Sequence, residues 1–114
     1  MSIKKFKCPL YGFKFHFFLG LTEDEVNQYL RERKSDEIEL DGCFGTCWQD
    51  KDHIFIWLKE EPKKKTLAAR LHHEVGHATN YVAKARGIKL CPDNDEALAY
   101  LSQWIFEKCI KLIL

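Results

Sequence analysis

The chain has 114 residues, of which 46% are hydrophobic and 13% aromatic, and 18 basic and 17 acidic residues leave a formal charge of +1. We expect a single domain over residues 1–114, because a chain of this length buries about two-thirds of the surface that its unfolded form exposes. The balanced charge gives no reason to expect nucleic acid or a membrane surface as a partner. No apolar run is long enough to predict a transmembrane helix.

The cysteines indicate a reducing environment. There are five of them, an odd number without a repeated spacing: Cys8, Cys43, Cys47, Cys91 and Cys109. The short apolar run at residues 15–21 lacks a small-residue cleavage site, so no secretory signal is expected and a cytoplasmic location is predicted. Three residues separate Cys43 from Cys47, unlike the two of common structural zinc sites, so we interpret both as buried thiols.

The N-terminal half predicts strands and one helix. Residues 3–19 are expected to form one strand or a short hairpin that bends near Gly12. Thr22 and Glu25 match a capping box, which predicts a helix over residues 23–34.

A hairpin is predicted next, because two β-rich runs at residues 43–49 and 53–59 flank the polar residues 50–52. Both faces of the second run are apolar, so neither face is expected to be fully solvated.

Two longer helices complete the expected α+β fold, in which about three mostly antiparallel strands pack with about three helices. The first of these two helices is capped by Thr66, extends to about Arg86 and stops at Gly87. Its apolar residues recur at helical spacing: Leu67, Leu71, Val75, Ala78 and Val82. The last helix runs from about Glu96 nearly to Leu114. It is apolar on much of its circumference, which predicts either a central helix or a surface through which the chain forms a homo-oligomer.

The most informative pattern lies in the helix at residues 66–86, where His73, Glu74 and His77 form an H-E-x-x-H motif. Residues four apart share one face of a helix, so the two imidazoles can converge on one Zn²⁺ ion. Glu74 then lies beside the open metal position and can accept a proton from water as a general base. Gly76 destabilises the helix by about 1 kcal/mol relative to alanine, which suggests that it permits the close approach of another backbone.

A catalytic zinc usually has three protein ligands. A third histidine in the extended H-E-x-x-H-x-x-G-x-x-H pattern is excluded, because Asn80 and Ala83 occupy its glycine and histidine positions. Glu96 is the best-placed acidic residue, 19 residues after the second histidine in the first turn of the last helix. Asp93 and Asp95 are the substitute ligands.

These residues resemble the gluzincin branch of zinc metallopeptidases, in which a helix with H-E-x-x-H is followed by a helix that donates a glutamate. The matching residues are His73, Glu74, His77 and Glu96, and residues 96–100, EALAY, look like the E-x-x-A-Y form of the second motif. The compact size is similar to that of minigluzincins and of small metallopeptidases encoded by phages and prophages. The resemblance covers roughly residues 66–104.

The resemblance implies a minimal zincin-like domain that hydrolyses peptide bonds of a peptide or protein substrate. Zn²⁺ would be held by His73, His77 and Glu96, with Glu74 as the catalytic base. Tyr100 lies one turn after Glu96, where its phenol either donates to an oxyanion as a catalytic group or is a core aromatic. In such folds a strand borders the active site and pairs with substrate, a role that the open edge of a strand at residues 53–59 would fill.

Three hypotheses are alternatives to a metallopeptidase. The first is a catalytically silent, phage-related module that binds zinc for structure or protein interaction. The second is a regulatory protease, and the third is an interaction domain whose motif is accidental. The remaining histidines are not expected to bind the zinc: His16 and His53 lie in predicted strands, and His72 points to a different side of the helix.

Overall fold

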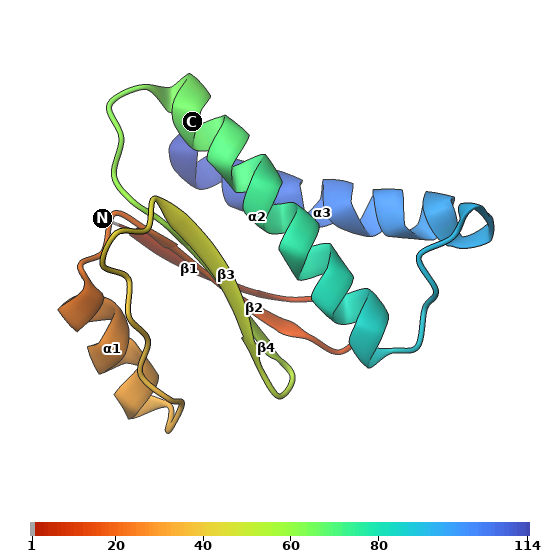
Figure 1. Cartoon of the computed structure of the whole chain (residues 1–114), viewed down its shortest axis with the longest axis horizontal. Coiled ribbons are helices and arrows are strands. Elements are labelled where there is room, and N and C mark those ends of the chain that lie inside the picture. Colours follow the sequence, from red (N-terminus) through yellow and green to blue (C-terminus); the bar gives the residue numbers. More distant parts are fainter. Residues whose placement is uncertain (1) are drawn as a thin grey trace.

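The computed structural model describes residues 2–114, which form four strands, three α-helices and one short 3₁₀ helix (Figure 1). In chain order these are β1 (Ser2–Lys7), β2 (Lys14–Leu19), α1 (Glu23–Glu32), β3 (Gly45–Asp50), β4 (His53–Leu58), α2 (Lys64–Ala85), the 3₁₀ helix η1 (Pro92–Asn94) and α3 (Asp95–Ile113). The predicted α+β class is confirmed at this level.

The sheet differs from the predicted one in strand number and direction. Its order is β1-β2-β4-β3, with antiparallel pairs at both sides and a parallel pair β2-β4 in the middle. The fourth strand arises because residues 3–19 form a complete hairpin, whose turn includes Gly12 at a positive φ of 75°. The parallel pair arises because α1 separates the two hairpins in sequence and carries the chain across the sheet.

The expectation of an open edge at residues 53–59 is wrong. β4 lies between β2 and β3, so its backbone groups pair on both sides, and residues 54–58 are all buried. The alternating apolar residues on both faces of this strand are the pattern of a central strand. The free edge beside α2 belongs instead to β3.

The helices divide between the two faces of the sheet (Figure 1). α1 covers one face through a buried cluster that includes Phe18, Leu30 and Phe55. α2 and α3 cover the other face, where the second cluster contains Phe17 and Leu71. The molecule therefore has two separate layers of core, one on each side of the sheet.

Local signals place two of the helix ends correctly. The capping box of α1 is confirmed, because the Glu25 backbone N–H donates to Thr22 and the Thr22 N–H donates to the Glu25 carboxylate. Gly87 follows α2 at a positive φ of 70°, as predicted. The cap at Thr66 is wrong: α2 begins at Lys64, and the backbone N–H of Thr66 donates to the Lys63 carbonyl.

α3 is not a central helix, because one face of it is buried and the other side is not. The buried face consists of Leu101, Ile105, Cys109 and Ile113. Trp104 extends the contact to the sheet, with its ring 5.5 Å from Phe6 and 6.1 Å from Phe15. Within residues 2–114 no helix combines the length and apolarity needed to cross a membrane, and all five cysteines are free.

Candidate metal centre

The middle of α2 carries the motif with its three polar side chains in different surroundings. The five apolar residues predicted as the core stripe of this helix are all buried against the sheet and α3. Glu74 lies on the same buried side and is only 6% exposed, whereas His73 and His77 are exposed. The helix thus places two imidazoles at the surface and one carboxylate beneath them.

The two imidazoles converge as the sequence predicts. Their Nε2 atoms lie 3.3 Å apart, and their rings are nearly perpendicular at 80°. Two nitrogens bound at zinc's ordinary bond length and a tetrahedral angle lie about 3.3–3.4 Å apart. One ligand atom from each of His73, Glu74 and His77 lies within 4.8 Å of the others, so this group could hold a metal ion.

The Glu74 carboxylate lies against the edge strand β3. A Cβ atom added to Gly45 would stand 3.2 Å from Oε2 of Glu74 and 3.0 Å from Leu58 Cδ2. Burial raises the pKa of Glu74, and the neighbouring His73 and His77 partly oppose this rise. The carboxyl group is therefore held in a position where it can accept a proton closer to neutral pH.

Gly45, rather than Gly76, is the glycine that permits a close approach at the site. A Cβ atom on Gly76 would meet nothing within 4 Å, so the expectation that another backbone approaches Gly76 is wrong. The role of Gly45 is not predicted from the sequence. A glycine in a strand often marks a place where another group approaches closely, and this is the signal that could have indicated the contact.

Two further side chains of the site lie between α2 and β3. The Tyr81 hydroxyl donates to the Cys47 backbone carbonyl over 3.4 Å, a long hydrogen bond. Burial raises the pKa of the Cys47 thiol, and the charge of Glu74 raises it further. Without a bound metal, Cys47 is therefore a neutral thiol beside the cluster.

The structure does not bring Glu96 into the group of close ligand atoms. α2 and α3 cross near their middles (Figure 1), and the rings of His72 and Phe106 mark this crossing with centroids 6.5 Å apart. The first turn of α3 with Glu96 lies away from that crossing, and Asp93, Asp95 and Glu96 are all exposed. Their role as the third ligand stays a prediction.

Tyr100 is 65% exposed and also lies outside the cluster. It lines an apolar pocket of about 410 Å³ together with residues 8–11, in the turn between β1 and β2. The alternative that Tyr100 is a core aromatic is therefore wrong, and its catalytic role stays a prediction.

Comparisons with protein families, with curated proteins and with solved structures return no match.

Proposed function

We propose that the chain is a zinc-dependent metallopeptidase that uses the α2 motif as its active site. The supporting observation is the pair of Nε2 atoms 3.3 Å apart, together with a buried carboxylate that has a ligand atom within 4.8 Å of both histidines. His73 and His77 would hold the ion, and Glu96 is the proposed third ligand. Zinc, when bound, supplies a Lewis acid that brings the pKa of water close to neutrality and polarises a carbonyl group.

Glu74 is the proposed general base. Burial raises its pKa, which makes the carboxylate a stronger base toward water, and the same group can return the proton to the leaving amine. Packing against β3 at Gly45 limits the positions that the carboxylate can occupy, so it is already oriented before substrate binds.

An extended peptide substrate is proposed to pair with β3. This strand is at the edge of the sheet and contacts α2, so its free backbone groups are near the motif. A peptide would bind to such an edge through main-chain hydrogen bonds, which depend little on its sequence. Pockets for its side chains would add a preference for particular residues.

A second candidate function is a catalytically silent zinc module. The observation that favours it is that all three ligand atoms within 4.8 Å come from the motif itself. If Glu74 binds the metal as the third ligand, it is not free to act as a base.

Glu74→Gln distinguishes the two functions. The peptidase proposal expects this variant to retain about one zinc per chain, measured by native mass spectrometry, and to lose hydrolysis of a broad peptide library. Glu107→Gln, which changes an exposed carboxylate on α3, is the matched control and should retain both properties. Loss of zinc by Glu74→Gln would assign Glu74 as a ligand, and an active Glu74→Gln variant would refute the proposed mechanism.

Glu96 requires a separate pair of variants. Glu96→Gln should weaken zinc binding at least roughly tenfold if its carboxylate is a ligand, whereas Asp93→Asn should leave zinc affinity unchanged. The reverse result would identify Asp93 in η1 as the third ligand.

A further inference from the structure

A second polar site lies on the opposite face of the sheet from the motif. A pocket of about 480 Å³ opens between β1, β2 and the end of α1. Its polar lining consists of Lys5, Lys7, Lys14, Arg33, His16 and His53. No acidic residue lines this pocket, although the chain as a whole is nearly neutral.

The positive charge of the pocket is only partly balanced by nearby carboxylates. Asp52 lies 4.0 Å from Lys14 and 3.5 Å from His53, and Glu32 lies 3.9 Å from the Arg33 guanidinium. Within the described residues 2–114, neither Lys5 nor Lys7 has a carboxylate within 4.0 Å. The pocket therefore keeps an excess of positive charge that an anion can neutralise.

The positive charge around the pocket affects the pKa of the buried His16 imidazole. Burial is the largest cause that lowers the pKa of His16 to about 4, and His53, Arg33, Lys5 and Lys14 lower it further. Positive side chains from β1, β2 and α1 thus act on the same point at the floor of the pocket.

The floor and one wall of the pocket are held in place by hydrogen bonds. His16 is 4% exposed, and its Nδ1 and Nε2 atoms lie 2.7 Å from the Tyr29 hydroxyl and 2.9 Å from His53 Nδ1. The Arg33 guanidinium stacks 3.4 Å above the Tyr29 ring and donates to the Tyr29 backbone carbonyl. This arrangement orients a cation over an ordered polar surface before any ligand binds.

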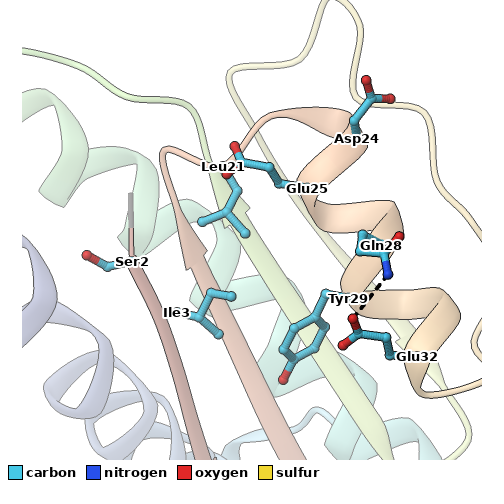
Figure 2. A pocket seen from close by; sticks show the side chains of 8 residues that line it. All are labelled: Ser2, Ile3, Leu21, Asp24, Glu25, Gln28, Tyr29 and Glu32. Carbon is cyan, nitrogen blue, oxygen red and sulfur yellow. Dashed lines mark hydrogen bonds between the residues drawn. The ribbon is translucent and has the colours of Figure 1, made fainter.

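The adjacent pocket between β1 and α1 has the opposite charge. Figure 2 shows it with Ile3 on β1 facing Tyr29 on α1, and with the side chains of Asp24, Glu25 and Glu32 along the same helix. An anion is therefore repelled from this acidic pocket and attracted to the basic pocket. The contrast restricts the anion site to the basic pocket.

We propose that the basic pocket binds the phosphate group of a small soluble phosphomonoester. Such a group carries a charge of about −1.5 to −2 and three acceptor oxygens, which match the unpaired lysines and the oriented guanidinium. A pocket of 480 Å³ lies in the range of small-molecule sites and leaves room for an organic part beyond the phosphate. This site is independent of the proposed peptidase function.

The test is an NMR titration of the metal-free full chain with inorganic phosphate and with glycerol 3-phosphate at constant ionic strength. We expect saturable shifts of the His16 and His53 ring protons, with weaker binding of acetate. The double variant Lys5→Gln and Lys7→Gln should weaken phosphate binding at least roughly tenfold, because it removes two charged donors. Lys63→Gln with Lys65→Gln is the matched control, since it removes the same charge from exposed residues before and within the first turn of α2.

Absence of saturable binding, or equal loss of binding in both double variants, would overturn the proposal. So would acetate binding as strong as phosphate binding. Co-sedimentation with phosphatidic acid vesicles that requires Lys5 and Lys7, without binding of glycerol 3-phosphate, would assign the same chemistry to a lipid headgroup and overturn the soluble ligand. Because both lysines are exposed, these variants are expected to fold, and far-UV circular dichroism checks this.

Discussion

A pair of close histidines lies on each side of the sheet, and the two pairs differ in their exposure and in the partners of their ring nitrogens. His73 and His77 are exposed, with Nε2 atoms 3.3 Å apart and a carboxylate beside them. In the other pair, Nε2 of His16 lies 2.9 Å from Nδ1 of His53, and Nδ1 of His16 is hydrogen-bonded to the Tyr29 hydroxyl.

A short distance between two imidazoles therefore does not by itself define a metal site. A ligand nitrogen must have a lone pair directed toward open space, and both nitrogens of His16 are occupied by neighbours. Within residues 2–114, only the α2 group brings three potential ligand atoms within 4.8 Å of one another. The prediction that His16 and His53 are unrelated to the zinc agrees with this arrangement.

The largest expected effect concerns the exposed pair. His77→Ala should weaken zinc affinity by more than about hundredfold, because it removes a direct ligand, and competition with a chromophoric chelator measures the change. His72→Ala is the matched control on the same helix, because His72 is exposed, its ring lies near Phe106 of α3, and it is not part of the group of close ligand atoms. Equal losses in the two variants would mean that the proposed histidine pair does not hold the metal.

The buried His16 should instead contribute to stability in a way that depends on pH. The pKa of His16 is lowered from 6.5 to about 4 in the folded chain, so the unfolded chain binds more protons between these values. Stability is therefore fully present above about pH 6.5 and is lost as pH falls, by up to about 2 kcal/mol between pH 7 and pH 5. Urea unfolding at several pH values measures this slope.

His16→Phe is the variant that isolates this contribution. It removes the titrating group, so the free energy of unfolding should depend less on pH over the same range. An unchanged slope in this variant would show that other groups cause the loss of stability.

The smallest expected effects come from two glycines near the exposed pair. Gly76→Ala should stabilise the chain by up to about 1 kcal/mol, because its added methyl group enters open space on a helix. Gly45→Ala should destabilise it by about 1 kcal/mol and displace the Glu74 carboxylate, lowering hydrolysis while zinc binding persists. Thermal unfolding and zinc content measured on both variants test this contrast. A destabilised Gly76→Ala variant together with a stabilised Gly45→Ala variant would contradict the packing described.

The sequence predicts those features that depend on nearby residues. The capping box at Thr22 and Glu25 and the pairing of His73 with His77 involve residues three or four positions apart, so their spacing determines the outcome. The parallel pairing of β2 with β4 and the contact of Gly45 with Glu74 join distant segments. No local spacing encodes these contacts, which explains why the strand order and the glycine that matters were both missed.

The central claim is that His73 and His77 hold zinc while Glu74 remains free to act as a base. Anomalous scattering at the zinc edge from a crystal grown with zinc tests this most directly. The predicted result is one zinc ion about 2.0–2.1 Å from both Nε2 atoms, with the Glu74 carboxylate outside the ligand set. Zinc bound elsewhere, or zinc bound between the histidines with Glu74 as a direct ligand, would contradict the account.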